Sequence, residues 1–518
     1  MKSTRTRRAF GAIFALSLVA AACGSDDDDS SDSGTVAEGT EASTAETTAG
    51  TTAEATEDTT AAATDDTTAE ATGDSTAPAG DGVRLGIMAE CEGAFGGFNE
   101  DVVAGATLAL INEAGATSNS TDTALDGFTG AEVNGVPIEL VGIGCGDDTA
   151  DRAVQEIRTL VEQDGANVVI GPLSGDEGIA IANYALDHPD VTFIDGISGA
   201  QDATLHVQAP NFFRYHGDGA QWNAGLGYTV HNDAGWDTVA VIADDYGFGW
   251  TSAAGFVADF CAAGGDVVTQ VFPPLGTTDY SSFIQQLPNP DEVDGYFWAV
   301  GGTGTNASLE AFLNAKGDLT GDQHAGNLFF SPTLAEALGT DIAGAYVGGF
   351  ASLPGDITTP EITEYLASAD AAWTTLAGGT SGNEPAPPSQ AMGFGFGYGY
   401  YVAGTALVQA LTETGSVDPA ELQAALAALE LDVPYGSVKL DENRQGIIDT
   451  FVAQLVLDEA TGEVVQQTKY IVPGVDQTFG GTYSSETDPP ERDNTPCEQR
   501  ELPWQGNLIP VVDGVPQR

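Results

Sequence analysis

Residues 83–115 read VRLGIMAECEGAFGGFNEDVVAGATLALINEAG, and this stretch decides the fold. The apolar run over residues 83–89 predicts a buried strand, and the helical spacing over Asn99–Ala114 predicts a helix after a glycine-rich loop. The pattern recurs at residues 239–265, where VAVIADDYGFG leads into a helix that ends in FCAAGG. Two such copies predict two similar lobes, each wound around its own sheet.

The rest of the body alternates apolar runs with helical periods, which predicts an α/β fold of two doubly wound parallel-sheet lobes. The predicted strands are Val83–Ala89, Val136–Ile143, Asn167–Leu173, Val191–Asp195, Thr238–Ala243, Val267–Phe272, Gly295–Val300 and Asn327–Ser331. The predicted helices are Asn99–Ala114, Ala150–Asp164, Glu177–Asp187, Gln221–His231, Trp250–Ala263, Ser308–Ala315, Pro360–Leu376 and Pro419–Leu429. The later segments expected to complete the second lobe are Val438–Leu440, Val452–Leu457 and Gln467–Val472. A ligand of such a fold is expected at the carboxyl ends of the strands.

Acidic residues dominate the composition, because 77 Asp and Glu face only 15 Lys and Arg and give a formal net charge of −62. The lysines do not cluster; they are Lys2, Lys316, Lys439 and Lys469. Nucleic-acid binding requires grouped basic side chains that neutralise phosphates. No nucleic-acid partner is therefore expected.

The amino terminus carries a predicted export signal over residues 1–22, in which a basic head precedes the apolar stretch Ala9–Ala22. That stretch is too short to span a bilayer. The sequence Ala-Ala-Ala before Cys23 resembles the lipobox of bacterial lipoproteins, in which the cysteine is lipidated. Simple secretion after cleavage is the alternative. We expect an exported protein anchored by lipid alone to the outer face of the cytoplasmic membrane, at the cell surface or in the periplasm.

Residues 23–81 follow as the lipidated cysteine and a linker. Residues 24–81 contain 16 acidic residues, no basic residue and almost no aliphatic or aromatic side chain. Such a composition cannot bury enough apolar surface to offset the entropy of ordering the chain. A disordered acidic Ser/Thr/Ala tether is therefore predicted.

Four cysteines remain in the body, an even number in an oxidising compartment. Cys91 and Cys145 each follow a predicted strand, and those two strands are expected to be neighbours. We therefore expect disulfides Cys91–Cys145 and, by remainder, Cys261–Cys497; free buried thiols are the alternative. No CxxC motif is present, so neither a metal site nor redox chemistry is expected.

Motifs of catalysis are missing from the sequence. It contains no HExxH, no GxSxG and no complete nucleotide-binding glycine motif, so no cofactor is expected. Residues Gln390–Leu411 carry no charge and are long enough to span a bilayer, but five glycines interrupt them and no basic residue flanks them. A buried helix is the favoured interpretation of that segment.

The order of these elements resembles the leucine/isoleucine/valine-binding family of type I periplasmic binding proteins, the solute receptors of ABC importers. The matching stretches are residues 83–115 and 239–249 as quoted above, residues 134–175, and GSVKLDENRQGI at residues 436–447. The resemblance implies two lobes joined by a three-strand hinge, with no catalytic activity. Lobe 1 would comprise residues 83–212 plus 352–448 and lobe 2 residues 213–351 plus 449–480. The Ser118–Glu132 insertion and the 481–518 tail lie outside the family pattern.

The resemblance also implies which residues bind the solute. The positions that align with the family's ligand contacts are Phe98, Ser174, Gly175, Ile197, Ser198, Gly199, Tyr246 and Thr333. Two hydroxyl positions of the family are displaced by one residue, from Gly175 to Ser174 and from Gly199 to Ser198. Thr333 stands where amino-acid binders have the acid that receives the ammonium. A buried ammonium needs a carboxylate partner, so this change implies a ligand without one or a different acid.

Seven acids at predicted strand ends are candidates for that role: Glu90, Glu92, Asp176, Glu177, Asp195, Asp244 and Asp245. The favoured interpretation is that they form solvated surface, as charge runs usually do. No Lys or Arg is expected near these loops, which argues against an anionic ligand. The sequence thus predicts a lipoprotein receptor that binds a small polar solute, of the amino-acid or amide class, and delivers it to an ABC permease. The alternatives are a surface sensor of the same fold and an exported hydrolase or oxidoreductase.

Overall fold

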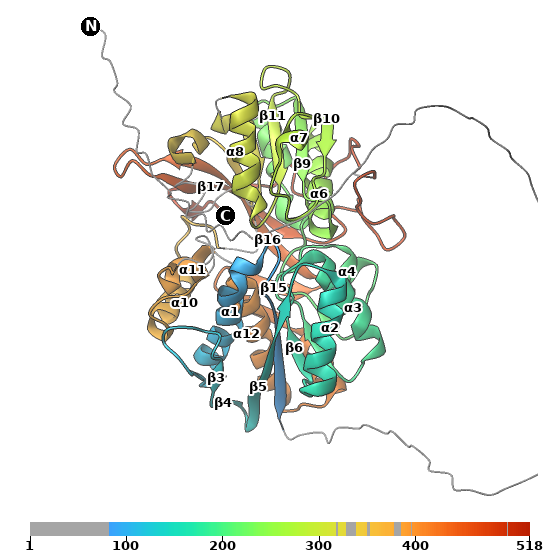
Figure 1. Ribbon diagram of the computed structural model, residues 1–518, viewed down its shortest axis with the longest axis vertical. Coiled ribbons are helices and arrows are strands. Elements are labelled where there is room, and N and C mark those ends of the chain that lie inside the picture. Colours follow the sequence, from blue (N-terminus) through green and yellow to red (C-terminus); the bar gives the residue numbers. More distant parts are fainter. Residues whose placement is uncertain are drawn as a thin grey trace, which may run out of the picture. The chain divides into compact units, whose positions relative to one another are not determined.

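The computed structural model describes residues 82–317, 320–327, 338–349, 353–377, 385–394, 396–494 and 496–518 (Figure 1). Three predicted features therefore lie outside the described residues: the signal peptide, the linker with Cys23, and the ligand position Thr333. Within the described residues, no helix is long and apolar enough to cross a membrane.

The first sheet has six strands in the order β4-β5-β1-β6-β7-β8. Its strands are β1 (Val83–Glu90), β4 (Ala131–Val133), β5 (Val136–Gly146), β6 (Val168–Ile170), β7 (Thr192–Ile194) and β8 (Phe212–Phe213). All neighbours are parallel except β4, which pairs antiparallel with β5 at the edge. The apolar run of β1 is buried because helices cover this sheet.

The helices of the first lobe come from two distant parts of the chain. They are α1 (Asn99–Ala114), α2 (Ala150–Arg158), α3 (Gly175–Asp187), α4 (Asp202–Leu205), α10 (Pro360–Ala372), α11 (Pro388–Phe394), α12 (Gly397–Thr414) and α13 (Pro419–Ala428). Helix α1 ends at Gly115, whose φ of 69° supplies a left-handed cap. The uncharged segment Gln390–Leu411 is divided between α11 and α12, and α12 is buried against α1. The buried-helix interpretation is therefore confirmed.

The second sheet has eleven strands, ordered β10-β9-β11-β12-β13-β16-β17-β18-β19, with β14 and β15 branching from β16. The parallel strands are β9 (Thr238–Ala243), β10 (Asp266–Val271), β11 (Gly295–Ala299), β12 (His324–Gly326) and β13 (Tyr346–Gly348). The antiparallel strands are β14 (Glu430–Val433), β15 (Gly436–Leu440), β16 (Gly446–Leu457), β17 (Val464–Val475), β18 (Ile509–Val512) and β19 (Val515–Pro516). The predicted α/β class with two lobes is confirmed.

Helices of the second lobe are α5 (Leu226–Asn232), α6 (Gly247–Ala263), α7 (Ser281–Ile284) and α8 (Gly304–Lys316). The single helix predicted over Gln221–His231 is wrong: a short 3₁₀ turn, Gln221–Asn223, precedes α5. Gly225, with φ 80°, separates the two because glycine adopts this left-handed conformation without steric cost. Most of the strand predicted at Asn327–Ser331 lies outside the described residues; β12 ends just before it, at Gly326.

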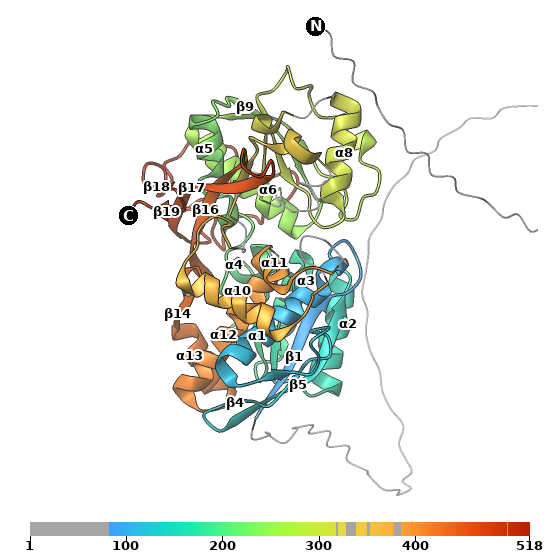
Figure 2. The same cartoon turned by 90° about the vertical axis from the view of Figure 1, so that its left-hand side faces the viewer.

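Two segments outside the family pattern also have defined structure. The insertion contributes a small ladder of β2 (Thr117–Ser118) and β3 (Phe128–Thr129) and most of the edge strand β4. The tail adds β18 beside β17, and β19 beside β18 (Figure 2). The strands β18 and β19 therefore extend the second sheet.

Helices α1 and α12 approach so closely that glycine is required on α1. A Cβ atom built on Gly105 would lie 2.0 Å from the backbone oxygen of Gly397. In an open helix Gly→Ala gains about 1 kcal/mol from helix propensity. Here we expect Gly105→Ala to lower the free energy of unfolding by about 1–3 kcal/mol, because the backbone of α12 must move.

Urea denaturation of Gly105→Ala beside Gly393→Ala measures this effect. Gly393 is the matched control, because its Cβ would meet only two side-chain carbons of Leu366, at 3.3 and 4.0 Å. Equal midpoints for the two variants would contradict close packing of α1 on α12.

Candidate functional site

Four carboxylates from both lobes gather where the strands of the two sheets end. Glu90 is the last residue of β1, Asp148 follows β5, Glu177 lies in the first turn of α3, and Asp244 follows β9. Their exposed fractions are 0%, 7%, 0% and 0%. We call these four residues the carboxylate cluster.

Glu90 and Glu177 form an acid pair within the cluster. Glu90 Oε1 accepts the backbone N–H groups of Leu173 and Ser174, at 3.2 and 3.1 Å. Glu177 Oε1 accepts those of Asp147 and Asp148, both at 3.1 Å. Burial, followed by the charge of Glu90, raises the pKa of Glu177 well above its usual range, and the two side chains hydrogen-bond each other. The pair therefore holds one proton at neutral pH and counts as a single negative charge.

Only one of the two carboxylate oxygens of Asp148 accepts hydrogen bonds. Its Oδ2 accepts the backbone N–H groups of Ala94 at 2.5 Å and Phe95 at 3.3 Å, whereas its buried Oδ1 has no hydrogen-bond partner among the described residues. Burial and then the charge of Glu90 raise the pKa of Asp148 to about 7. A buried carboxylate with an empty acceptor position is costly unless a donor or a cation meets it.

Asp244 has the same arrangement in the second lobe. Its Oδ2 accepts the backbone N–H of Gly301 at 2.8 Å, and its buried Oδ1 has no partner among the described residues. Burial raises the pKa of Asp244 to about 8, and the charge of Asp148 adds to the shift. The two aspartates therefore lie close enough to repel each other.

Loops of the two lobes meet directly around the cluster. The backbone N–H of Thr303 donates to the carbonyl of Ala94 at 3.1 Å, and the N–H of Gly247 donates to Asp176 Oδ1 at 2.9 Å. Asp148 holds the loop that contains Ala94, and Asp244 holds the loop that precedes Thr303. Each aspartate thus fixes one side of a contact between lobes.

The predicted ligand residues Ser174, Gly175 and Tyr246 lie at this same junction. Ser174 precedes α3, is 1% exposed, and its Oγ has no partner among the described residues. A Cβ on Gly175 would lie 2.8 Å from the backbone nitrogen of Phe248 in the other lobe. The Tyr246 ring is 5.9 Å from that of Phe248, and its pKa is raised by burial and by nearby Asp244, Asp148, Asp176 and Glu90.

The predicted ligand loop Ile197-Ser198-Gly199 is buried, but the hydroxyl of Ser198 already donates a hydrogen bond within the first lobe. Ser198 donates its Oγ–H and its N–H to Asp195, at 2.5 and 2.8 Å, and His216 Nε2 lies 2.7 Å from the same carboxylate. In a serine nucleophile the imidazole contacts the hydroxyl and the carboxylate lies behind it. Here the carboxylate lies between serine and histidine, so these residues do not form a nucleophile with its base.

Phe98 is half-buried and packs edge-on against Phe396, with ring centroids 4.5 Å apart. The ring centroid of Phe95 lies 6.3 Å from that of Phe98 and 5.8 Å from that of Phe396. The three rings join the loop after β1 to the start of α12. The structure thus shows Phe98 as part of an aromatic cluster.

Two expectations about the strand-end acids are wrong. Glu90, Glu177, Asp195 and Asp244 are buried rather than solvated, while Glu92 is exposed. Basic residues also lie beside these loops: Arg492 of the tail forms an ion pair with Asp245, and Arg214 donates to the carbonyl of Ser198 at 3.1 Å. Sequence reasoning missed Asp148 as well, although its place after a strand that ends in GCG could have indicated it.

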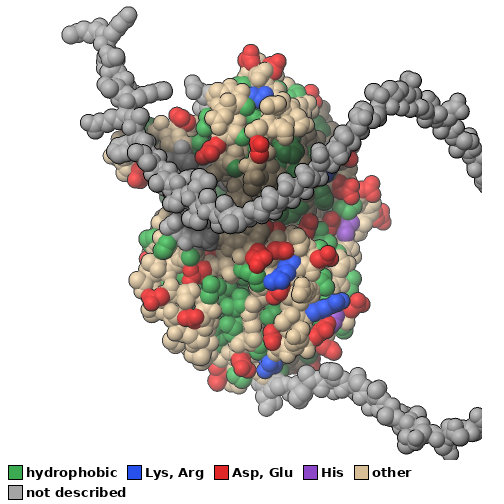
Figure 3. Space-filling view, in the orientation of Figure 1, with side chains coloured by type: hydrophobic (Ala, Val, Ile, Leu, Met, Phe, Trp, Pro, Cys, Tyr) green, Lys and Arg blue, Asp and Glu red, His purple; other side chains and the backbone are tan. Residues whose placement is uncertain are grey.

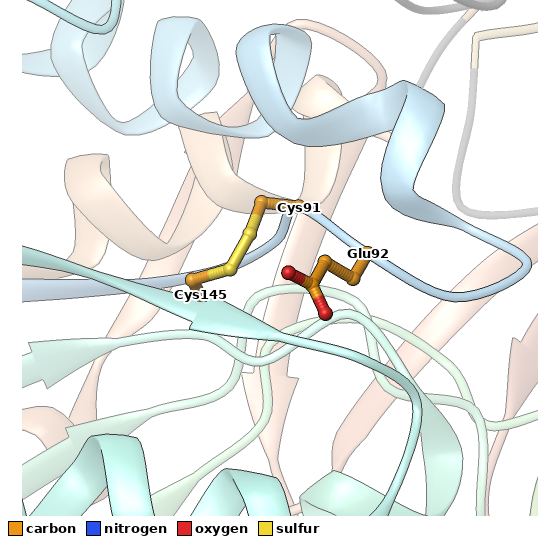
Figure 4. A group of neighbouring side chains, drawn as sticks. All are labelled: Cys91, Glu92 and Cys145. Carbon is orange, nitrogen blue, oxygen red and sulfur yellow. A yellow bond between two sulfur atoms is a disulfide. The ribbon is translucent and has the colours of Figure 1, made fainter.

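Both disulfides expected from the sequence, Cys91–Cys145 and Cys261–Cys497, are present. Among the described residues, Cys91, Cys145 and the exposed Glu92 form the one group of three potential metal ligands with atoms within 4.8 Å of one another (Figure 4). Metal coordination needs the thiolate. In the disulfide both sulfurs are bonded to each other, so this group has no metal-binding role.

A family model described as "Periplasmic binding protein" matches residues 82–463, and the chain belongs to that family. A comparison with curated proteins finds no match. The fold is shared with the leucine binding protein of Thermotoga maritima, at 16% identity over 76% of this chain and 99% of the other, with a TM-score of 0.57.

Two ABC transporter solute binding proteins have the same fold. One, from R. palustris and solved with benzoate, is 20% identical over 76% of this chain and 97% of its own, with a TM-score of 0.61. The other, from Rhodopseudomonas palustris BisB5 and solved with 3,4-dihydroxybenzoic acid, is 19% identical over 77% and 99%, with a TM-score of 0.62.

Proposed function

We propose that this protein is the extracytoplasmic solute receptor of an ABC importer, which binds a small polar solute of the amino-acid or amide class between its lobes. The observation that supports this most directly is the set of buried, unpartnered polar atoms at the strand ends of both lobes: Ser174 Oγ, Asp148 Oδ1 and Asp244 Oδ1. Ligands of doubly wound sheets bind at these ends. The family membership and the fold of the solute binding proteins agree with this function.

The receptor would act by binding and closure, without chemistry. Solute bound by both lobes favours the closed arrangement by the difference between its affinities for the closed and open forms. The permease would recognise the closed form. The arrangement of Ser198, Asp195 and His216 offers no nucleophile, which supports a receptor rather than an exported hydrolase.

Lipidation at Cys23 would hold the receptor at the membrane, with residues 24–81 as the tether. We expect cells that produce the chain to incorporate a fatty-acid label into it and to retain it with the membrane. Cys23→Ser should remove the label and release the protein. A labelled Cys23→Ser variant would contradict the anchor.

Thermal unfolding of the purified full chain, refolded free of bound solute, tests the receptor function. A solute present at 100 times its dissociation constant adds about 2.7 kcal/mol of stability and raises the melting temperature. We expect this from at least one amino acid or amide, with one molecule bound per chain by calorimetry and no conversion of the solute. If no amino acid, amide, polyamine, sugar or aromatic acid raised the melting temperature, the proposal would be overturned.

A further inference from the structure

Resting on the proposed receptor function, we propose that Asp148 and Asp244 together bind a primary ammonium or guanidinium group of the solute, one carboxylate from each lobe. The resemblance predicts the ammonium position at Thr333, which offers no negative charge. The pair Asp148 and Asp244 supplies that charge from other elements, namely the ends of β5 and β9. We call these two residues the aspartate pair.

Each member of the aspartate pair accepts hydrogen bonds with only one of its two carboxylate oxygens. Asp148 and Asp244 each hold a backbone loop with Oδ2 and leave Oδ1 buried and unpartnered among the described residues. The other unpartnered carboxylate oxygens of the cluster, on Glu90 and Glu177, are explained by the proton that this acid pair shares. Asp148 and Asp244 have no such explanation, so their open oxygens call for a donor from the solute.

The charges of the neighbouring carboxylates also favour a cationic group of the solute. Within the described part of the chain, no ion pair involves Asp148 or Asp244, and their charges repel each other and that of Glu90. A cation between two carboxylates removes that repulsion, whereas an anionic group would increase it. Tyr246, which follows Asp244 by two residues, is buried at this junction, and an aromatic ring is a favourable neighbour for an organic cation.

An organic cation fits better than a metal ion. Calcium and magnesium take six or more oxygen ligands at about 2.0–2.6 Å, which brings carboxylate oxygens close together. Among the described residues, the carboxylate cluster has no three ligand atoms within 4.8 Å of one another. An ammonium or guanidinium reaches farther, because its N–H donors add their own length to each contact.

The position of the aspartate pair couples binding to closure. The loop held by Asp148 and the loop held by Asp244 already join through the Thr303–Ala94 hydrogen bond. A cation that contacts both Oδ1 atoms would add a second link at the same place. An amine would therefore favour the closed form more strongly than the same solute without its amine.

Calorimetric titration of the full chain with matched solutes tests the assignment. The amine probes are L-leucine, L-leucinamide, agmatine and putrescine; the amine-free partners are 4-methylpentanoate and 4-methylpentanamide. We expect at least one amine probe to bind and its amine-free partner to bind at least tenfold more weakly. Asp148→Asn and Asp244→Asn should each weaken the amine probe at least tenfold, while Glu92→Gln, a matched change at the exposed neighbour, should leave its affinity unchanged.

Any of the following three results would overturn the assignment. Binding of an amine-free solute that Asp148→Asn and Asp244→Asn leave intact would retain the receptor function and remove the aspartate pair from the site. A response to calcium or magnesium alone that these variants abolish would make the pair a metal site. If no solute bound in the titrations, the proposed receptor function would be contradicted as well.

A second measurement on the unaltered chain needs no variant to fold. An amine binds the ionised carboxylates, so its affinity should fall at least fivefold between pH 8 and pH 6, and binding at pH 6 should release protons to the buffer. The titratable groups that interact with the pair are Glu90, Glu177, Asp147, Tyr246 and Tyr280. Burial raises the pKa of Asp148 to about 7 and that of Asp244 to about 8, which places their titration in this window. Affinity that is constant from pH 8 to pH 6, without proton release, would contradict the assignment.

Discussion

Replacing Arg214 with methionine is expected to lower the free energy of unfolding by about 3–5 kcal/mol and to abolish solute binding. Arg214 is fully buried between the lobes, at the end of β8. Its guanidinium donates to the carbonyls of Ser198 and Ala200, at 3.1 and 2.6 Å, and to Thr204 Oγ1 at 2.7 Å. It also donates to Gln445 Oε1. Methionine fills similar space but leaves the carbonyls of Ser198 and Ala200 and the Thr204 Oγ1 atom without this donor, and Gln445 Oε1 keeps only the Thr204 hydroxyl.

The same residue joins two of the connections between the lobes. The backbone N–H of Arg214 donates to the carbonyl of Arg444 at 3.0 Å, and the N–H of Gly446 donates to the carbonyl of Arg214 at 2.7 Å. The side chain donates hydrogen bonds to two carbonyls of the predicted ligand loop, those of Ser198 and Ala200. Loss of the guanidinium therefore disturbs both the hinge and the loop, and stability and binding should fall together.

Urea denaturation and solute titration of Arg214→Met beside Arg518→Met measure the effect. Arg518 is the matched control, because it is 66% exposed and pairs only at the surface, with Asp449 at 2.9 Å. Surface changes of this kind are usually within about 0.5 kcal/mol. If the two variants denatured at the same urea concentration, the buried network around Arg214 would have no role in stability.

Much of the fold could be predicted because its signals are local. Helix α1 has the predicted bounds, Asn99–Ala114, since the helical spacing and the glycine cap lie in one stretch. Strand β9 likewise matches its apolar run over Thr238–Ala243. The strands of the tail could not be found this way: β18 is four residues long, contains Pro510, and exists only because β17 offers it an edge.

The site was harder to predict because burial there depends on the meeting of two lobes. In the sequence, Glu90 and Asp244 are acids in an acidic protein, and the acidic surface visible in Figure 3 makes solvation the natural interpretation. Their burial arises from loops far apart in the chain. The ion pair of Arg492 with Asp245 likewise joins residues 247 positions apart. Family resemblance predicted Ser174 and Tyr246 as ligand residues, but local pattern could not reveal which atoms lack partners.

Removing the disulfide between Cys261 and Cys497 is expected to lower the free energy of unfolding by about 2–5 kcal/mol. Cys261 is buried in α6, and the bond closes a loop of 236 residues. The tail has further attachments nearby. Trp504 Nε1 donates to Asp259 Oδ1 at 2.7 Å, and the Trp504 ring lies 4.6 Å from that of Phe479. The disulfide thus secures a packed segment to the second lobe.

The double variant Cys261→Ser/Cys497→Ser should therefore unfold at lower urea, and limited proteolysis should cut the tail around Trp504 faster than in the unaltered chain. Cys91→Ser/Cys145→Ser is the matched control, since that bond closes a loop of 54 residues. Loop-closure entropy predicts that its loss costs about 1 kcal/mol less. The tail also contacts the first lobe, where the carbonyl of Thr487 lies 2.9 Å from His206 Nε2. If the tail stayed protected from proteolysis and stability were unchanged in the first variant, the remaining contacts of Trp504 and β18 would be sufficient to hold it, and the disulfide would be dispensable.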